Sequence, residues 1–165
     1  MPSDTRPQPA VRIRAATDND IHAMTRVVNA AFVVEDFIEG TRTDAANMAE
    51  LMRKGEFLVA EDDSNQITAC VYTELRGERG YLGMLSVDPP RQGTGLGRVM
   101  VEAAENHCRS RGCRWVDLRV LSPRRELLPF YEKFGYTQIR TEEFNPPRPL
   151  RVPIECYGII LSKPL

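Results

Sequence analysis

Three glycines on alternate residues, Gly93, Gly95 and Gly97, join a short apolar run to an amphipathic segment. The apolar run, residues 81–87, predicts a buried strand, and the residues from 96 onward predict a helix. Because glycine has no Cβ, the backbone at this joint can approach a ligand closely and adopt conformations that other residues avoid. The first turn of the helix adds free N–H groups and the positive end of the helix dipole. The joint therefore predicts a site for a phosphate or pyrophosphate.

The residues on either side of this joint predict a mixed α/β domain. An antiparallel meander is expected over residues 56–87, followed by a strand, helix and strand that imply a parallel pair. The sheet should therefore be mixed and strongly twisted, with about six or seven strands and about four helices. The expected strands are 11–15, 56–61, 66–75, 81–87, 115–121, 136–144 and 152–161, and the expected helices are 17–33, 44–54, 96–111 and 125–134.

Length and charge limit the classes of function. A chain of 165 residues fits one domain, expected over residues 11–165 after a loose leader at 1–10. The net charge of −1 gives no electrostatic reason to expect nucleic acid or an anionic membrane as partner. No apolar run approaches the roughly 20 residues of a membrane span, and the first ten residues lack an apolar signal core. A cytoplasmic protein is expected.

The chain has four cysteines and two histidines, and their spacing fits no metal-binding pattern. We therefore expect reduced, mostly buried thiols and no metal.

Two well-known phosphate loops do not fit the glycine stretch. The loop of nucleotide triphosphatases requires Gly-Lys followed by Ser or Thr, whereas Arg98 and Val99 follow Gly97 here. The dinucleotide fingerprint places its third glycine three residues after the second and lies in an early βαβ unit. Here the third glycine comes after two residues, and a meander precedes it.

The run Gln92-Gly93-Thr94-Gly95-Leu96-Gly97 instead resembles the acyl-CoA-binding signature of the GNAT superfamily of N-acyltransferases. That signature has Arg or Gln, two residues, Gly, one residue, then Gly or Ala. A second run, Phe130-Tyr131-Glu132-Lys133-Phe134-Gly135-Tyr136, resembles the later helix of the same family. The two runs stand in the family's order, and the likeness covers roughly residues 11–162. It implies a GNAT-like fold.

The resemblance implies transfer of an acetyl group from acetyl-CoA, as co-substrate, to a primary amine. It makes Tyr131 the donor of a proton or hydrogen bond to the leaving thiolate. It places the pantetheine arm on the backbone of the strand before the loop and the pyrophosphate on the loop's N–H groups, with Arg98 adding positive charge. The implied cofactor-binding residues are Leu85, Ser86, Val87, Gln92, Gly93, Thr94, Gly95, Leu96, Gly97, Arg98, Arg124 and Tyr131.

Two positions depart from the family pattern. Many members carry a glutamate base on the strand before the loop, but residues 81–86 contain no acid, so Glu74 on the preceding strand is the candidate base, with Glu78 as an alternative. An asparagine common seven residues before the tyrosine is replaced by Arg124, which we expect to contact phosphate. The missing strand glutamate leaves open a non-catalytic acyl-CoA-binding or regulatory module.

The acceptor, a small molecule or a peptide, is expected between residues 32–42, the strand of Glu74 and the loop 144–150. Arg42, Arg140 and Arg148 are the arginines that could read a carboxylate there. The sequence leaves the acceptor unidentified, and it fits a monomer or a homodimer equally well.

Overall fold

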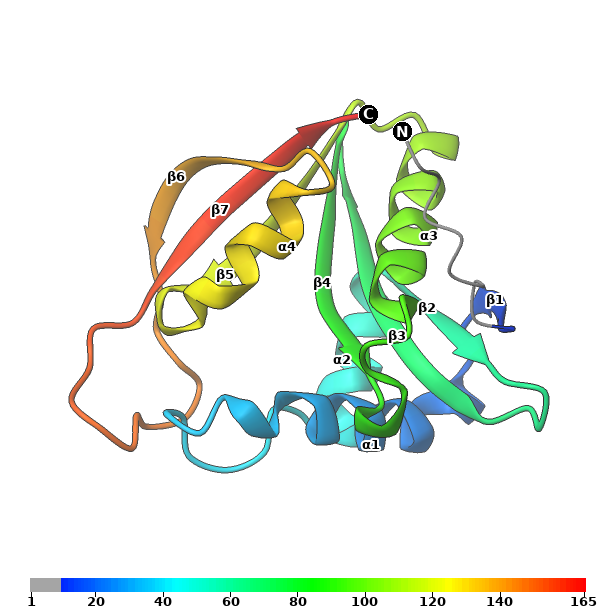
Figure 1. Ribbon diagram of the computed structural model, residues 1–165, viewed down its shortest axis with the longest axis horizontal. Coiled ribbons are helices and arrows are strands. Elements are labelled where there is room, and N and C mark those ends of the chain that lie inside the picture. Colours follow the sequence, from blue (N-terminus) through cyan, green and yellow to red (C-terminus); the bar gives the residue numbers. More distant parts are fainter. Residues whose placement is uncertain (1–9) are drawn as a thin grey trace.

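The computed structural model describes residues 10–165, so the expected leader lies almost entirely outside the described residues. One sheet forms the centre, and helices cover both of its faces (Figure 1). Its strands are β1 (Arg12–Ala15), β2 (Glu56–Glu61), β3 (Ile67–Arg76), β4 (Arg79–Val87), β5 (Trp115–Leu121), β6 (Thr137–Glu143) and β7 (Tyr157–Pro164). The helices are α1 (Ile21–Ala31), α2 (Ala45–Lys54), α3 (Leu96–Ser110) and α4 (Leu128–Glu132), with short 3₁₀ turns at 18–20, 32–34, 89–91 and 122–127.

Within residues 10–165 the sheet has seven strands in the order β1-β2-β3-β4-β5-β7-β6, and only the β4–β5 pair is parallel. The expected meander, the mixed sheet and the parallel pair are confirmed. The expected last strand, residues 152–161, is wrong at both ends, because β7 runs over Tyr157–Pro164. Gly158 of β7 pairs with Leu121, the last residue of β5, so residues 152–156 have no strand beside them with which to pair.

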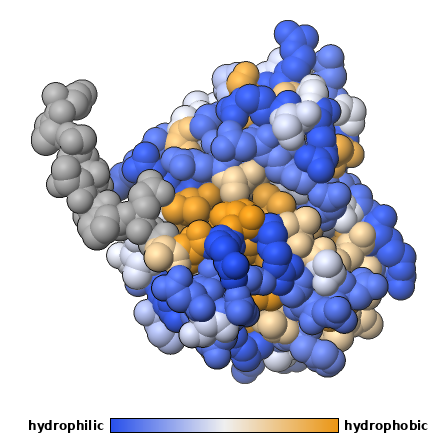
Figure 2. Space-filling view, turned by 90° about the vertical axis from the view of Figure 1, so that its right-hand side faces the viewer, coloured by the Kyte–Doolittle hydropathy of each residue, from blue (hydrophilic) through white to orange (hydrophobic). Residues whose placement is uncertain are grey.

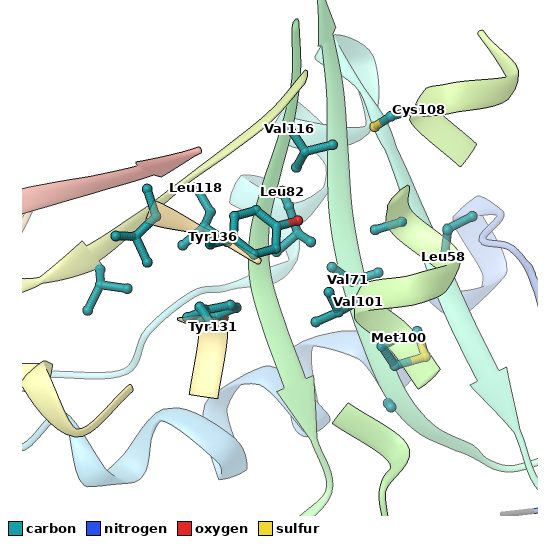
Figure 3. Close-up of a cluster of buried hydrophobic side chains, with 14 of the residues drawn as sticks. Leu58, Val71, Leu82, Met100, Val101, Cys108, Val116, Leu118, Tyr131 and Tyr136 are labelled. Carbon is teal, nitrogen blue, oxygen red and sulfur yellow. The ribbon is translucent and has the colours of Figure 1, made fainter. Parts of the chain in front are cut away.

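Alternate residues of the strands feed two separate cores. Phe57 and Val59 of β2 face the core under α1 and α2, whereas Leu58 and Ala60 face the core under α3 and α4. In Figure 3 the ring of Tyr131 lies on the β5 side of β4, and the ring of Tyr136 lies across that strand. The side chains of α3 lie on the other side of that strand, over β2 and β3. The sheet thus separates two helical layers.

One face of α3 is fully buried and the residues beside that face are only partly buried. Val99, Ala103 and His107 belong to the partly buried set. The fully buried face is Leu96, Met100, Val101, Ala104, Glu105 and Cys108. The Nε2 atom of His107 lies 3.0 Å from a carboxylate oxygen of Glu56, so this histidine is packed and paired.

The glutamate on the buried face of α3 has two partners. Tyr136, just after α4, donates a 2.9 Å hydrogen bond to Glu105 Oε2, and Lys163 of β7 donates one of 3.1 Å to Oε1. A buried carboxylate is tolerated only when it is paired and hydrogen-bonded in this way. The network ties α3, which packs on β3 and β4, to the outer strands on the far side of β5.

Strands β4 and β5 separate after a short pairing. Only Arg79–Leu82 of β4 pairs with β5, at Trp115–Leu118. Two residues of β4, Met84 and Leu85, then oppose the single residue Val71 of β3, which is a β-bulge. Met84 has φ +50°, a left-handed conformation that is rare for a long side chain. The bulge redirects β4, and Figure 1 shows the two strands diverging toward their carboxyl ends.

On the side of the molecule where β1 lies, apolar side chains gather in a patch bordered by polar and charged ones (Figure 2). None of the helices within residues 10–165 combines the length and apolar character that crossing a bilayer requires.

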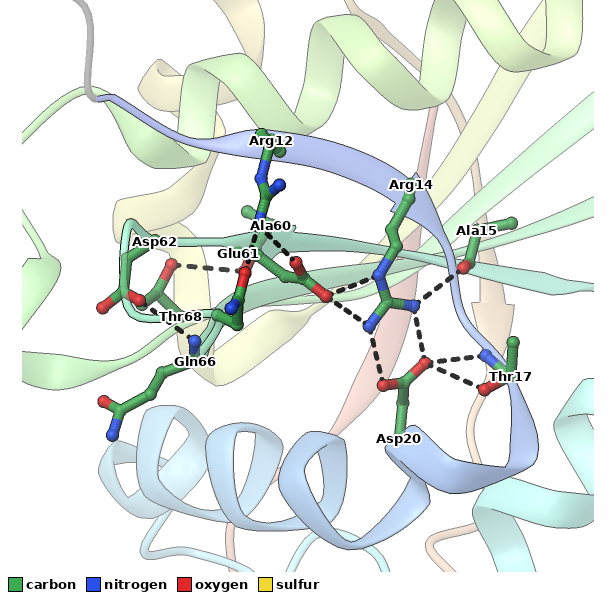
Figure 4. A network of polar contacts seen from close by, with 11 residues as sticks. Arg12, Arg14, Ala15, Thr17, Asp20, Ala60, Glu61, Asp62, Gln66 and Thr68 are labelled. Carbon is green, nitrogen blue, oxygen red and sulfur yellow. Dashed lines mark hydrogen bonds and ion pairs between the residues drawn. The ribbon is translucent and has the colours of Figure 1, made fainter.

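An arginine-centred network fixes the edge of the sheet to the start of α1 (Figure 4). Arg14 of β1 makes a bidentate pair with Asp20, at 2.8 and 2.9 Å, and its Nε donates to Glu61 at 2.6 Å. Asp20 also accepts from the Thr17 N–H at 2.7 Å, as part of a capping box between these two residues. The Arg14 hydrogen bonds, outweighing the opposing effect of burial, hold the pKa of Asp20 below its usual value.

This network predicts a dependence of stability on acidity. A carboxyl whose pKa is lowered by folding contributes stability above its unfolded pKa, and that stability is lost as the pH falls through the folded value. Asp20→Asn should lower the free energy of unfolding at pH 7 by about 1–2 kcal/mol and by less near pH 3. Urea denaturation at the two pH values measures this. The exposed control Asp18→Asn should show no such convergence, and equal losses at both pH values would contradict the role of Asp20.

Candidate active site

A cavity of about 880 Å³ lies where β4 and β5 diverge. Its lining comes from five parts of the chain: the end of α1 with the segment that follows it as far as Arg42, β4, the glycine loop with the start of α3, β5 with the 3₁₀ turn and α4 that follow it, and residues 143–148. The divergence exposes one edge of β4, because no strand among residues 10–165 pairs with that edge beyond Leu82. Free strand edges bind extended ligands through their backbone groups.

The glycine loop presents a set of unused backbone donors at one end of this cavity. Gly93 has φ +79° and Gly95 has φ +86°, the left-handed region where glycine is favoured. The backbone N–H groups of residues 93–98 make no hydrogen bond within residues 10–165. Helix α3 begins at Leu96, directly after these turns, so its dipole adds to the same positive potential. The loop therefore fits an anionic phosphate.

The side chains of the loop serve mainly to hold its shape. Gln92 donates its backbone N–H to Pro89 and its side-chain amide to the Val87 carbonyl, at 3.2 and 3.1 Å, so the free donors begin at Gly93. Thr94 Oγ1 donates to the Arg91 carbonyl at 2.6 Å. Leu96 is buried in the core under α3. These side chains are thus engaged within the protein, and the hydrogen-bond donors that the loop leaves unused are backbone N–H groups.

Two arginines flank the loop, and each has a carboxylate partner. Arg91 donates to Asp62 on the β2–β3 turn at 2.8 Å, and Arg98 donates to Glu102 one turn further along α3 at 3.1 Å. Both line the cavity. Their exposed pairs are weak, so the guanidinium groups remain able to approach a phosphate.

The three expected residues of β4 occupy different environments. Leu85 and Val87 line the cavity. Ser86 is buried, pairs with Cys70 of β3, and donates its hydroxyl to the Met84 carbonyl at 2.9 Å, which supports the bulge. The edge of β4 beyond Leu82 is thus free of strand pairing at the cavity, while Ser86 supports the shape of the bulge.

Tyr131 lies in α4 against the same cavity. Its ring packs edge-on against Phe130 and Tyr136, with centroids 5.0 and 6.0 Å apart. Its hydroxyl has no hydrogen-bond partner within residues 10–165, and the residue lines the cavity. Burial raises the pKa of the Tyr131 phenol above its ordinary value, against the opposing effect of Arg124. The phenol is therefore a neutral donor at physiological pH.

Glu74 lies beside a second cavity, of about 420 Å³. The two cavities share lining residues at the separation of the strands, Tyr81, Gly83, Met84, Leu118, Arg42 and Arg119. Tyr72 donates to one oxygen of Glu74 at 2.7 Å and Arg76 to the other at 3.1 Å. Burial acts to raise the pKa of Glu74, but these two hydrogen bonds prevail and lower it. Glu74 is thus a stable carboxylate next to, and not within, the larger cavity.

A carboxylate that the sequence interpretation missed lines the larger cavity. Glu35 follows the 3₁₀ turn after α1, and its Oε2 accepts from Arg124 at 2.8 Å. Its Oε1 is buried without a hydrogen-bond partner. Burial raises the pKa of Glu35 above its usual value, although Arg124 and Arg42 act to lower it. Its partner is distant in sequence, so no local pattern marks this pair.

Arg124 is held between two carboxylates. Besides Glu35, it donates through Nε to Glu126 at 2.5 Å, and only 14% of its side chain is exposed. Arg124 lines the cavity, and its guanidinium holds Glu35 and Glu126, so its contact with a phosphate stays a prediction.

The segments expected to form an acceptor pocket do meet. Ile38 and Leu150 form an isolated bridge, and Glu39 donates its N–H to the Pro149 carbonyl at 2.9 Å. Arg42 and Arg148 line the larger cavity, and Arg140 lines only the second. Phe37, also expected there, is buried away from both.

The thiols and acids do not suggest a metal centre. All four cysteines are free, and Cys70, Cys108 and Cys113 are buried. Within residues 10–165, no group of three or more His, Cys, Asp or Glu side chains is arranged to hold a metal ion.

Comparisons with known proteins agree with this geometry. The mycothiol acetyltransferase of Propionibacterium freudenreichii subsp. shermanii is 30% identical over 160 residues, which cover 92% of this chain and 51% of that protein. The chain thus spans about half the length of the curated relatives that it matches.

Two solved structures have the same fold. Ard1 from Thermoplasma volcanium has a TM-score of 0.77 at 16% identity, with 94% of this chain and 98% of that chain covered. A phosphinothricin acetyltransferase from Sinorhizobium meliloti, solved in complex with AcCoA, has a TM-score of 0.72 at 15% identity, with 94% and 89% covered.

The model of the acetyltransferase (GNAT) family matches residues 21–136, which include the free edge of β4, the glycine loop and Tyr131. With this match over more than half of the chain, and with a relative at 30% identity, the chain belongs to the acetyltransferase (GNAT) family.

Proposed function

We propose that this protein transfers an acetyl group from acetyl-CoA to a primary amine. One observation carries the proposal: a single cavity joins the unused N–H groups of the glycine loop, the free edge of β4 and the hydroxyl of Tyr131. A phosphate-binding end, an edge for an extended arm and a proton donor are the three parts that thioester chemistry on a CoA carrier requires.

Acetyl-CoA spans this cavity with its pyrophosphate on the N–H groups of residues 93–98. Arg98 and Arg91 stand at that end and add positive charge. The pantetheine arm runs along the free edge of β4, from Val87 toward Gly83, and brings the thioester to the separation of the two strands. The acetyl group then lies between Tyr131 and the residues shared with the second cavity.

The reaction is a direct attack of the neutral amine on the thioester carbonyl. The new C–N bond forms as the carbonyl oxygen gains charge, which a backbone N–H of β4 stabilises. The C–S bond then breaks, and the CoA thiolate takes a proton from the neutral Tyr131 hydroxyl. A base accepts the proton that the amine loses and then releases it to solvent, while Tyr131 is reprotonated from solvent.

Two carboxylates are candidates for that base. Glu35 lines the cavity of Tyr131, keeps one oxygen without a partner, and has a raised pKa, all of which suit a proton acceptor. Glu74 has a lowered pKa and both oxygens hydrogen-bonded, so it is the weaker base. We favour Glu35, with Glu74 as the residue named by sequence alone.

The activity is tested by measuring free CoA thiol after adding acetyl-CoA and a panel of amines. The panel holds amino acids, polyamines, aminoglycosides, peptides with free N-termini, and mycothiol-related amines, because the relatives carry that name. Thiol release that depends on one class of amine supports the proposal. Tight CoA binding by calorimetry without thiol release from any amine would favour the non-catalytic acyl-CoA-binding module.

Tyr131→Phe should lower turnover roughly 10- to 1000-fold with little change in acetyl-CoA affinity, because only the proton donor is lost. Steady-state kinetics and calorimetry separate the two quantities. Tyr157→Phe is a matched control, since that tyrosine lies outside both cavities and bonds Arg125. Unchanged turnover in Tyr131→Phe would exclude the donor role.

Gly95→Val should abolish acetyl-CoA binding, because a side chain would occupy the space of the pyrophosphate. Gly112→Val is an unusually close control: Gly112 has φ +87° against +86° for Gly95, and open space surrounds both. Each change should cost a similar backbone strain, about 1–2 kcal/mol, seen as a similar fall in the melting temperature. If both variants bind acetyl-CoA equally well, the glycine loop is not the phosphate site.

Glu35→Gln should lower kcat and remove the acidic limb of the pH profile of kcat/KM. A base with a raised pKa is protonated as the pH falls through that value, so the wild-type limb should lie above the range of an ordinary glutamate. Glu74→Gln serves as the comparison and should retain the limb. If Glu74→Gln loses the acidic limb and Glu35→Gln keeps it, the base is Glu74. Circular dichroism checks that both variants fold.

A further inference from the structure

Three arginines in the larger cavity have no carboxylate partner. Arg42 comes from the segment between α1 and α2, Arg119 from β5, and Arg148 from the loop after β6. Within residues 10–165, none of the three forms an ion pair or donates a hydrogen bond to an acid. The other three arginines of the cavity each have such a partner, namely Arg91, Arg98 and Arg124.

Arg42 and Arg148 are partly buried, whereas Arg119 is exposed, and the charges of Arg119 and Arg148 both act on Arg42. Arg42 stacks over Phe32 at 5.3 Å, and Arg119 stacks over Phe144 at 4.9 Å. Nη1 of Arg148 is buried with no hydrogen-bond partner. Burial lowers the pKa of Arg42, and the charges of Arg119 and Arg148 add to that effect, while Glu35 and Tyr81 oppose it.

Uncompensated cations inside a cavity destabilise the fold unless a ligand neutralises them. A guanidinium group presents a planar pair of N–H donors that matches a carboxylate or a phosphonate in two parallel hydrogen bonds. Glu35, with its one unpartnered oxygen, lines the same cavity and suits the amine. The cavity thus offers one site for a cation and one for an anion.

The position of the cluster separates it from the phosphates of acetyl-CoA. Arg42 and Arg119 also line the second cavity, which begins where β4 and β5 separate. No residue of the glycine loop lines that second cavity. The cluster therefore lies at the end of the site opposite the pyrophosphate, where the acceptor enters.

We infer that the acceptor carries an anionic group, a carboxylate or a phosphonate, close to its amine, and that Arg42, Arg119 and Arg148 bind this group. The inference rests on the proposed acetyl transfer and deepens it. It also fits the apolar residues beside the cluster, Phe32, Val34, Ile38 and Phe144, which suit the hydrocarbon part of an amino acid or short peptide.

The test uses matched sets of amines with acetyl-CoA. Each set holds an amino acid or dipeptide, its C-terminal amide and the amine without the acidic group, and 1-aminoalkylphosphonates are added to distinguish the two anions. Thiol release should be at least about 10-fold greater in kcat/KM for an acid than for its amide. Arg148→Gln, Arg42→Gln and Arg119→Gln should each raise KM for the acid about 10- to 100-fold and abolish the preference.

Controls separate this site from the rest of the protein. Arg53→Gln, on the exposed face of α2, should change nothing. The affinity for acetyl-CoA should be the same in all four variants, and a large fall in the three cluster variants would overturn the inference by assigning the arginines to CoA. Amides that react as well as their acids would also overturn it while leaving acetyl transfer intact.

Calorimetry distinguishes failure of this inference from failure of the proposed function. The same acids and amides are titrated into the CoA-loaded protein, without any reaction. Acids that bind more tightly than amides, with the difference lost in Arg148→Gln, support the anion site even if no thiol is ever released, and in that case acetyl transfer alone is wrong. Equal binding of acids and amides would overturn the inference.

Discussion

The site depends on the early end of the pairing between β4 and β5. Four residues of each strand pair, and the strands then diverge around a bulge in which Met84 takes a left-handed conformation. Such a conformation costs on the order of 1–2 kcal/mol, so the surrounding structure must hold it. Ser86 does so locally through its hydroxyl on the Met84 carbonyl. The strain produces a free strand edge inside the molecule, and this edge leads directly into the glycine loop.

Diverging strands require other contacts to hold the two parts of the sheet together. Glu105 of α3 supplies one, because it binds Tyr136 after α4 and Lys163 of β7 at once. The bridge between Ile38 and Leu150 supplies another at the opposite end. Both contacts join the two parts of the sheet and leave the cavity between the strands open. The same arrangement brings buried charges near the cavity, where low dielectric strengthens their effect on a bound group.

The sequence predicted the fold closely and the site only partly. Period-2 and helical patterns, with glycine and proline at the boundaries, located the strands and helices up to residue 144, since these signals are local. The last strand was misplaced because its beginning depends on where β5 ends, which no local pattern shows. The phosphate loop and Tyr131 were found because their residues are contiguous. Glu35 was missed because its burial and its contact with Arg124 form only when the chain folds.

The sequence by itself determined the order of the elements, the turn chemistry of Gly93 and Gly95, and the family to which the chain belongs. Only the tertiary structure decided which charges are paired. Glu74 is hydrogen-bonded at both oxygens, Glu35 at one, and Arg148 leaves a buried nitrogen without a partner. The physical reason is that ionisation and pairing depend on burial and on distances between residues far apart in the chain, whereas strands and helices depend mainly on neighbours.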